Sequence, residues 1–344
     1  MSLTVRDDVP LAPLTTLELG GPARHLVEAR DDATVLEALR WAAARGLRVL
    51  VLGGGSNLVI GDGGFDGLVL RLATRGQTFA ASDADGEVLA TVAAGEPWDA
   101  FVAETVARGL AGLECLSGIP GLAGATPIQN VGAYGQEVAE TIHAVQAVER
   151  ATGTRVQLSP DDCAFAYRDS AFRRAPQRWV VLGVTFALHA GGAPTLRYRE
   201  LADALPSTAT LAEARATVLA LRARKSMVID PADPNRRSAG SFFTNPIVDT
   251  AVADALGPDA PRWPAGPGRV KLSAGWLIEH AGIAKGTRRG PVGVSTRHAL
   301  ALVHHGGGTT DALVALAREV RAAVASRFGV TLTPEPVFVG ASLD

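Results

Sequence analysis

Four separate polar clusters in this 344-residue sequence hold side chains that could carry proton or anion chemistry. Ser241 stands in the stretch AGSFF, where its hydroxyl could give or take a proton if a site orients it. Arg168, in YRDS, has a guanidinium whose shape suits a carboxylate held through two hydrogen bonds. Glu335 lies between two prolines that limit its backbone freedom. Lys225 follows Arg222 and Arg224, and together these three basic residues could neutralise a diphosphate.

Each of these residues also has a purely structural interpretation. Ser241 could be a serine at the edge of a strand, and the absence of GxSxG or SxxK around it argues against a hydrolase nucleophile. Arg168 could form a surface ion pair with Asp169. Glu335 could be an exposed acid entering an edge strand, and Lys225 could simply mark the charged end of a helix. The presence of all four residues in one chain, rather than any one of them, favours a functional over a structural interpretation.

Two glycine-rich stretches could hold a ligand near these side chains. Residues 116–135 contain five glycines and two prolines from Gly118 onward, which excludes a long helix and predicts an ordered loop. Residues 53–57 (GGGSN) follow the apolar run 47–52, so bare backbone N–H groups would lie at the end of a buried strand, where phosphates bind well. GGGSN is neither a Walker loop nor GxGxxG, and no helix follows it. The alternatives are a tight β-turn and a turn-rich connector.

The composition excludes several classes of function. A net charge of -2 leaves no basic face for nucleic acid. No apolar run approaches the roughly 20 residues of a membrane span, and the N-terminus lacks the apolar core of a signal peptide. Cys115 and Cys163 form neither a disulfide framework nor a CxxC pair, and the histidines have no metal spacing. We therefore expect a cytoplasmic protein with two buried thiols, no metal and no membrane or nucleic-acid partner.

Periodicity and turn residues predict an α+β protein with many strands and few long helices. Asp32 is predicted to cap a helix over residues 33–45 that Gly46 closes, and Pro97 and Gly109 to bound a helix over 98–108. The other predicted helices cover residues 211–224, 248–256, 272–281 and 309–327, with a short capped turn at 160–163. The predicted strands cover residues 24–28, 47–52, 68–72, 88–94, a hairpin of 142–150 with 154–158, 180–188, 291–294, 299–304 and 331–339.

Six motifs in fixed order make the sequence resemble the UDP-N-acetylenolpyruvoylglucosamine reductase family, the flavin reductases of bacterial peptidoglycan precursor synthesis. The resemblance runs from Thr15 to Phe338. The motifs are VLGGGSN (51–57), SGIPG with PIQNVGAYGQE (117–137), FAYRDSAF (165–172), AGSFFTNP (239–246), SAGWLIEHAGIAKG (273–286) and PEPVF (334–338).

The resemblance implies a fold with a two-subdomain FAD-binding module, of the PCMH or vanillyl-alcohol-oxidase type, and a C-terminal α/β substrate-binding domain. The boundaries that we predict are residues 1–72 with 330–344 for the first FAD-binding subdomain. Residues 73–229 would form the second, and residues 230–329 the substrate-binding domain.

The resemblance also implies roles for individual residues. Arg168, Ser241 and Glu335 match the family's three catalytic positions. Tyr198 matches the tyrosine that covers the sugar nucleotide in the type I branch, and Lys225 and Asn245 match substrate contacts. The segment between Lys225 and Ser241 is longer than the family's pattern, and the positions around His298 vary in the family. The residues expected to hold FAD without a covalent bond are Gly53, Gly54, Gly55, Ser56, Asn57, Gly118, Ile119, Pro120, Gly124, Ala125, Thr126, Gln129, Asn130, Gly132 and Gly135.

The implied reaction reduces UDP-N-acetylglucosamine enolpyruvate to UDP-N-acetylmuramate with NADPH, by way of FAD. Arg168 and Glu335 would polarise the substrate carboxylate, and Ser241 would give a proton to C2 while the hydride arrives at C3. We expect a monomer whose partners are these two small molecules. Two rival interpretations are an oxygen-reacting carbohydrate or alcohol oxidase on the same FAD fold, and a non-enzymatic flavin or sugar-nucleotide sensor.

Overall fold

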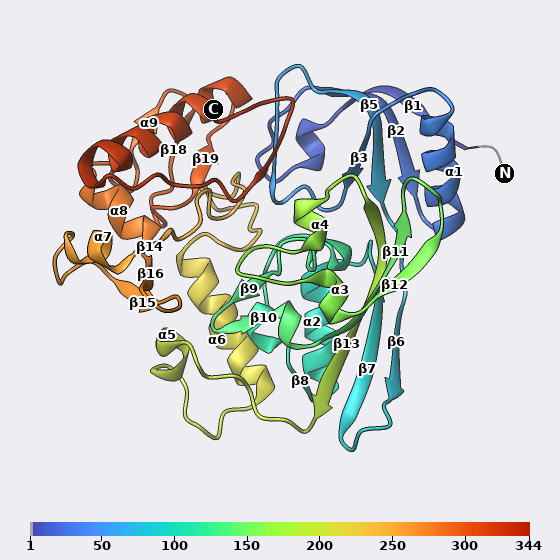
Figure 1. Ribbon diagram of the computed structural model, residues 1–344, viewed down its shortest axis with the longest axis horizontal. Coiled ribbons are helices and arrows are strands. Elements are labelled where there is room, and N and C mark those ends of the chain that lie inside the picture. Colours follow the sequence, from blue (N-terminus) through green and yellow to red (C-terminus); the bar gives the residue numbers. More distant parts are fainter. Residues whose placement is uncertain (1–2) are drawn as a thin grey trace. The chain divides into compact units, whose positions relative to one another are not determined.

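The chain forms two units, which Figure 1 shows with their helices and strands labelled. The computed structural model describes residues 3–344. Unit 1 contains the residues up to Val9, Ala23–Gly54 and Asp66–Val228, and unit 2 contains Pro10–Pro22, Gly55–Phe65 and Ile229–Asp344. The chain therefore passes from one unit to the other inside GGGSN, between Gly54 and Gly55. The three-part division made from the sequence stays a prediction.

The smaller sheet of unit 1 has the strand order β1-β2-β5-β3, and β3 runs parallel to β5. Helix α1 covers Asp32–Ala43 and buries an apolar stripe that includes Val35 and Leu39. Gly46 has a φ of 63°, so it ends the helix in the left-handed conformation as predicted. The strands are β1 (Arg6–Pro10), β2 (Pro22–Ala29), β3 (Val49–Leu52) and β5 (Phe65–Leu72).

The predicted cap of α1 is wrong by one residue. Asp31, not Asp32, has the extended backbone of a cap, and its carboxylate accepts hydrogen bonds from the Thr34 N–H and hydroxyl, both at 2.8 Å. These bonds hold the pKa of Asp31 below its usual range. Asp32 is the first helical residue and pairs with Arg155 at 3.2 Å. Two adjacent aspartates both fit the cap pattern, and only the backbone conformation decides between them.

The larger sheet of unit 1 is antiparallel and has the order β12-β11-β13-β7-β6, with β8 beside β13. Its central strand β13 is buried on both faces along most of its length, as predicted, and Phe186 on this strand packs against Trp98 and Phe101. The predicted hairpin of β11 and β12 is confirmed. Strand β6 was missed because it is a mostly exposed edge strand. The bounds are β6 (Gln77–Ala81), β7 (Glu87–Ala93), β8 (Leu110–Ala111), β11 (Ile142–Glu149), β12 (Arg155–Leu158) and β13 (Trp179–Ala190).

Three helices of unit 1 begin at the residues that the sequence indicated. Pro97 precedes α2 (Trp98–Ala107), Ser159 caps α3 (Pro160–Cys163), and α6 spans Leu211–Arg224 behind a capping box formed by Thr210 and Glu213. Two further short helices are α4 (Ala171–Arg174) and α5 (Arg199–Ala202). Both Cys115 and Cys163 are buried, as predicted.

Unit 2 has small sheets and three helices among its described residues, packed around a core that includes Phe242, Phe243 and Leu277. The predicted C-terminal strand over residues 331–339 is too long. Only β20 (Val337–Val339) forms, because Pro334 and Pro336 have no N–H to donate. It pairs in parallel with β4 (Leu58–Ile60), a strand missed after GGGSN. The others are β14 (Ile247–Asp249), β15 (Arg262–Pro264), β16 (Arg269–Leu272), β17 (Arg288–Arg289), β18 (Val292–Val294), β19 (Leu302–His304), α7 (Thr250–Asp254), α8 (Ala274–His280) and α9 (Thr310–Phe328).

The mixture of sheets and helices agrees with the predicted α+β class. Among residues 3–344, no helix is both long enough and apolar enough to cross a membrane. The elements matter here mainly because their ends and connections carry the candidate site residues.

Candidate functional site

The loop over residues 116–135 is ordered by the 3-10 turns η2 (Glu114–Leu116) and η3 (Ala123–Ala125). It is also ordered by the antiparallel pairing of the short strands β9 (Gly132–Ala133) and β10 (Gln136–Glu137). Two of its glycines are required by the protein itself. A Cβ on Gly124 would lie 2.8 Å from the Cα of Ala94, and Gly118 has a φ of 72°, a left-handed conformation that favours glycine. Close packing and backbone conformation within unit 1, and not only the approach of a ligand, therefore explain these glycines.

The Asn130 amide, predicted to contact the cofactor, is hydrogen bonded within the protein. Its Nδ2 donates to Glu137 at 2.8 Å and to the Ala166 carbonyl at 3.1 Å, and its Oδ1 accepts from the Ala139 N–H. Asn130 is buried and has a φ of 45°, a conformation that asparagine tolerates better than most residues. Its neighbour Gln129 accepts from Arg173 at 3.4 Å. Asn130 thus shapes the loop and ties it to the YRDS segment.

The YRDS segment docks directly onto this loop. Arg168 donates from its guanidinium to the carbonyls of Asn130 at 3.3 Å and Gly132 at 2.5 Å, and Ser170 donates to the Ile128 carbonyl at 2.6 Å. Asp169 pairs with Arg174, while the guanidinium of Arg168 reaches the loop carbonyls. Arg168 therefore lies with its charged end against the loop.

A buried carboxylate that the sequence reasoning missed links the loop to the segment that bears Tyr198. Glu114 is fully buried, and it accepts from the Gly112 N–H at 2.8 Å, the Thr195 N–H at 2.8 Å and Gln136 Nε2 at 3.2 Å. Gln136 in turn accepts from the Cys115 N–H at 3.0 Å. A glutamate inside the apolar run GLECL was the available signal, because a buried charge needs several partners.

Two predicted substrate contacts, Tyr198 and Lys225, meet around Tyr134 of the loop. The rings of Tyr134 and Tyr198 lie edge to face with centroids 5.3 Å apart, and Lys225 Nζ is 5.8 Å from the Tyr134 centroid. Lys225 also pairs with Glu200 at 2.6 Å. Burial alone would lower the pKa of Lys225, but the hydrogen bond to Glu200 and nearby negative charge raise it overall. The lysine is therefore a fixed positive charge beside two aromatic rings.

The first two glycines of GGGSN differ in whether the protein has space for a side chain there. A Cβ on Gly54 would lie 2.8 Å from the Cα of Gly121, so the protein excludes a side chain there. A Cβ on Gly53 would meet nothing closer than Leu122 at 3.8 Å, and the φ of Gly53 lies outside the left-handed range. The packing of the protein would therefore allow a side chain at Gly53 and does not explain why this residue is a glycine.

In unit 2, Ser241 lies on an irregular segment flanked by two other stretches of main chain. On one side, the Phe242 N–H donates to the Leu300 carbonyl at 2.7 Å, and Ser238 forms a β-bridge with Val303. On the other side, the Glu335 N–H donates to the Phe242 carbonyl at 2.9 Å. Backbone pairing therefore brings Ser241 and Glu335 onto adjacent segments. It also places His298 beside Ser241, with 3.4 Å between Nε2 and Oγ.

Residues far apart in the sequence hold this segment in place. Thr16 donates its hydroxyl to the Ser238 carbonyl at 2.6 Å, and Glu18 forms ion pairs with both Arg236 and Arg237. Burial would raise the pKa of Glu18, but the hydrogen bonds and charges of the two arginines lower it. The arginines that flank Ser241 in the sequence are thus engaged with the N-terminal part of unit 2.

Two further predicted residues have defined positions in unit 2. Asn57 lies next to Glu335, because the Val337 N–H donates to the Asn57 carbonyl at 2.9 Å and the Asn57 amide donates to the Glu335 carbonyl at 3.5 Å. Asn245 accepts from the Ala274 N–H at 2.9 Å, at the start of α8. Asn57 therefore holds the Glu335 segment, whereas Asn245 supports a helix end.

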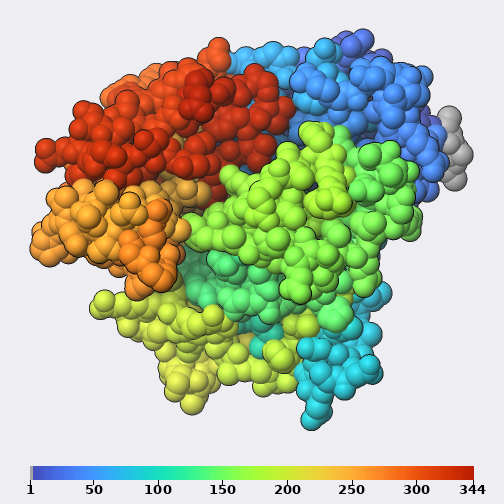
Figure 2. All heavy atoms as spheres, in the orientation of Figure 1, coloured from blue at the N-terminus to red at the C-terminus, as the bar shows by residue number. Residues whose placement is uncertain are grey.

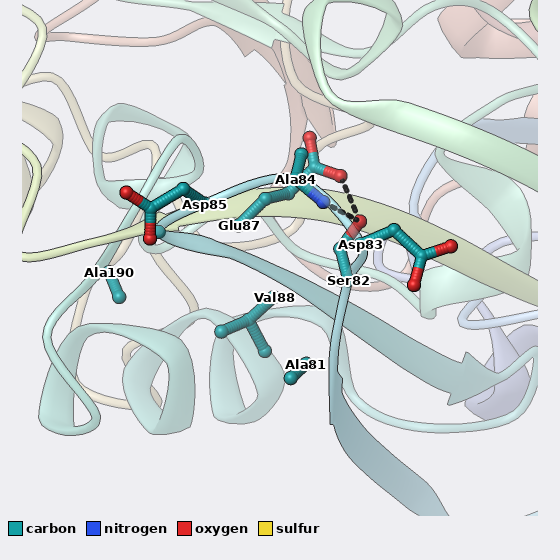
Figure 3. A pocket seen from close by; sticks show the side chains of 9 residues that line it. Ala81, Ser82, Asp83, Ala84, Asp85, Glu87, Val88 and Ala190 are labelled. Atoms are coloured by element: carbon teal, nitrogen blue, oxygen red, sulfur yellow. Dashed lines mark hydrogen bonds between the residues drawn. The ribbon is translucent and has the colours of Figure 1, made fainter.

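A hollow at the β6–β7 turn contains none of the predicted site residues. It is lined by acidic residues including Asp83 and Asp85, and Ser82 closes the turn by donating to Glu87 at 2.7 Å and accepting from the Ala84 N–H (Figure 3). The turn projects from the surface (cyan in Figure 2). Its hydrogen bonds are those of a tight hairpin, so we do not assign it to the site.

Comparison with known proteins points to one family along the whole chain. The FAD binding domain model matches residues 23–159, and the model of the UDP-N-acetylenolpyruvoylglucosamine reductase C-terminal domain matches residues 231–339. The reductase of that name from Streptomyces coelicolor is 54% identical, over 98% of this chain and 90% of the relative. The one from Thermobifida fusca is 48% identical over 100% of both.

A solved structure gives the same result. The UDP-N-acetylenolpyruvylglucosamine reductase of Thermus caldophilus superposes with a TM-score of 0.68 at 26% identity, covering 98% of this chain and 99% of that one. The predicted fold class, an α+β protein with an FAD-binding module followed by a separate C-terminal domain, is therefore confirmed.

Proposed function

Because the chain belongs to the UDP-N-acetylenolpyruvoylglucosamine reductase family, and is thus a flavin-dependent oxidoreductase, we propose that it reduces UDP-N-acetylglucosamine enolpyruvate to UDP-N-acetylmuramate with NADPH. One observation carries the proposal beyond the family name. Ser241 and Glu335, almost a hundred residues apart in the sequence, lie on directly paired backbone segments. A hydroxyl and a carboxylate carried by adjacent backbone segments suit a reaction at a carbon next to a carboxylate.

The residues of the two glycine-rich stretches fit a bound flavin. At Gly53 nothing in the protein excludes a side chain. A ligand that passes close to the backbone is therefore a sufficient reason for glycine. The N–H groups of residues 53–57 and the loop over residues 116–135 would hold the cofactor without a covalent bond. The chemistry that FAD would supply there is hydride transfer, from NADPH to C3 of the enolpyruvyl group.

Arg168 and Glu335 are proposed to act on the substrate carboxylate. Negative charge builds on C2 and on this carboxylate as the hydride arrives, and a guanidinium can hold two carboxylate oxygens at once. The loop carbonyls that Arg168 contacts keep its charge in one place before the reaction begins. Charges placed in advance at a developing anion contribute several kcal/mol in other enzymes, on the order of 3 kcal/mol for one donor.

Ser241 is proposed to give the proton to C2. The pKa of a free serine hydroxyl is far too high for an ordinary acid, so the transfer needs a short distance and a strongly basic carbon in a site without bulk water. Tyr198 and Lys225 would bind the sugar nucleotide, with the fixed charge of Lys225 near its diphosphate. Asn245 would contribute through the α8 helix end that it supports.

The test is an absorbance experiment on the purified protein. A yellow protein that NADPH bleaches, and that UDP-N-acetylglucosamine enolpyruvate then restores in the absence of oxygen, is the expected result. Bleaching by a sugar or an alcohol, with recovery only in oxygen, would replace the proposal with an oxidase. A protein that binds flavin but is bleached by neither would make it a sensor.

A further inference from the structure

We propose that His298 is a positioning residue that donates a hydrogen bond from Nε2 to Ser241 Oγ and so directs the serine proton toward the substrate. The inference rests on the proposed role of Ser241 as the acid. Nothing in the sequence pattern assigns a role to this histidine. The starting observation is the 3.4 Å distance between His298 Nε2 and Ser241 Oγ. That distance is at the long end of the hydrogen-bond range, as catalytic contacts often are before a substrate binds.

Backbone pairing, and not a chance meeting of two side chains, sets this neighbourhood. The Phe242 N–H donates to the Leu300 carbonyl at 2.7 Å, and Ser238 is bridged to Val303. These two main-chain contacts fix the segment with Ser241 against β19 and against the connection between β18 and β19. His298 lies on that connection, so the fold itself presents the imidazole to the serine.

The turn that carries His298 is itself held from several directions. The Ala301 N–H donates to the His298 carbonyl at 3.1 Å, and the Ser295 N–H donates to the Ala301 carbonyl at 2.8 Å. The buried Asn235 accepts from the Thr296 N–H at 3.0 Å. Asn235 belongs to the long segment between Lys225 and Ser241, so this stretch of sequence helps to fix the histidine. A catalytic acid is effective only if its neighbours hold it in one geometry.

The direction of the hydrogen bond follows from what the acid must do. A serine hydroxyl has one proton and two lone pairs. If Ser241 donated that proton to His298, the proton would point away from the substrate. If Nε2–H donates instead, it occupies a lone pair of Oγ and leaves the O–H bond free to turn toward C2. The same donor stabilises the negative charge that remains on Oγ after the proton has moved to C2, and solvent protonates Oγ afterwards.

The decisive experiment is a double-mutant cycle on the flavin-loaded enzyme, with reduction by NADPH and reoxidation by the enolpyruvyl substrate followed separately. His298→Phe keeps a flat ring and removes the donor. We expect reoxidation at saturating substrate to slow roughly 10- to 100-fold, with reduction unchanged. His298→Gln can place an amide N–H near the position of Nε2 and should recover to within about threefold of the original rate. In a Ser241→Ala background, His298→Phe should change the remaining rate less than about twofold.

Several results would overturn the inference. They are an unchanged reoxidation rate in His298→Phe, an equal loss in the Ser241→Ala background, or a loss that saturating substrate removes. The last would make His298 a substrate contact. His280→Gln, at an exposed histidine of α8 whose Nδ1 lies 2.8 Å from the Trp276 carbonyl, is the matched control and should behave as the unaltered enzyme. An unaltered enzyme that the substrate cannot reoxidise would contradict the proposed function instead, so the two failures are distinct.

A second measurement does not depend on turnover. In protein labelled with nitrogen-15 in its histidines, Ser241→Ala should shift the resonance of His298 Nε2 because a hydrogen-bond partner has been removed. The His280 signals should stay in place. An unmoved His298 signal would show that the two side chains are not hydrogen bonded in solution and would overturn the inference.

Discussion

The two units hold their candidate residues by different means. In unit 1, the side chains of Arg168 and Ser170 bond to the backbone of the loop over residues 116–135, and that of Asn130 bonds from the loop to the Ala166 carbonyl. In unit 2, backbone bonds between neighbouring segments place Ser241 and Glu335, and the side chains of Thr16 and Glu18 hold only the residues before Ser241. Side chains thus shape the region proposed to bind flavin and sugar nucleotide, whereas main-chain pairing shapes the region proposed to transfer the proton.

This difference predicts different consequences for substitutions in the two units. A side chain that holds a loop can be removed only at the cost of the loop's shape, so changes in unit 1 should alter binding and stability together. A side chain presented by paired backbone can be removed without disturbing its support. Changes at Ser241 should therefore alter chemistry alone. The following substitutions test this difference between the two units.

The largest effect is expected for Ser241→Ala. Loss of a general acid lowers rates by about 10²- to 10⁴-fold, so reoxidation by the enolpyruvyl substrate should slow by roughly 10³-fold. Reduction by NADPH and the melting temperature should hardly change, because the backbone bonds of Phe242 remain. Stopped-flow absorbance of each half-reaction measures the effect. If both half-reactions keep their rates, Ser241 is not the acid.

Arg168→Lys should come next. A lysine cannot donate to two carbonyls in the fixed fork that Arg168 uses for Asn130 and Gly132, and it holds a carboxylate less well. Reoxidation should slow by about 10²-fold, and flavin affinity should fall because the loop loosens. Fluorescence titration of the apoprotein with FAD measures the affinity. Arg174→Lys, which alters the neighbouring ion pair with Asp169, is the control. Equal losses in both variants would remove the special role of Arg168.

Gly53→Ala and Gly54→Ala form a matched pair that tests the cofactor loop. A Cβ at Gly54 would collide with Gly121, so this variant should lose about 1–3 kcal/mol of folding free energy even without flavin. A Cβ at Gly53 has room in the protein, so the apoprotein should unfold as the original does while its FAD affinity falls about tenfold or more. Thermal unfolding of the apoproteins and FAD titration separate the two effects. Normal FAD binding by Gly53→Ala would exclude close contact at that glycine.

Lys225→Met should mainly weaken substrate binding. We expect KM for the UDP-sugar to rise about tenfold, with little change in reoxidation at saturation, because uniform binding is lost rather than a contact specific to the transition state. The pKa of Lys225 is raised, so the lysine stays charged and the effect should be constant between about pH 6 and 9. Arg224→Met, at an exposed position one residue earlier, is the control. A loss that appears only in the saturated rate would contradict the assignment.

The sequence alone predicted the parts of the fold that depend on short-range signals in the chain. Helix α6, the β11–β12 hairpin and the end of α1 at Gly46 follow from capping residues, alternation and a glycine with positive φ. Short or exposed elements such as β4 and β6 were missed because a few residues at an edge have little pattern of their own. The cap at Asp31 depended on a backbone choice that two adjacent aspartates leave open.

The candidate site could be predicted only where residue type and motif carry the signal. Ser241, Arg168 and Glu335 stand out by chemistry, but nothing in the sequence reveals that the Glu335 N–H meets the Phe242 carbonyl, since that bond spans 93 residues of chain (335 − 242). Glu114 and the Ser241–His298 pair depend on such long-range contacts as well. Tertiary packing selects these partners, and local pattern cannot.

The smallest expected effect concerns Asp99, which tests how far side chains hold the loop of unit 1. Asp99 accepts from the Gly118 N–H at 2.6 Å and from both guanidinium nitrogens of Arg215 at 2.6 and 2.8 Å. Burial would raise the pKa of Asp99, but the hydrogen bonds to Arg215 and Gly118 and the charges of Arg215 and Arg222 lower it overall.

A carboxyl group with a lowered folded-state pKa stabilises the fold above its unfolded pKa of about 3.9, and this stabilisation disappears as the pH falls through the folded value. Asp99→Asn should therefore cost about 1 kcal/mol at pH 7, a modest value because the side chain is 40% exposed, and the cost should shrink below about pH 4. Urea unfolding from pH 3 to 7 measures it. The control is Glu104→Gln, at a half-buried carboxylate of the same helix that pairs with Arg108 and not with the loop. A cost that is the same at every pH would mean that shape, and not charge, joins the loop to α6.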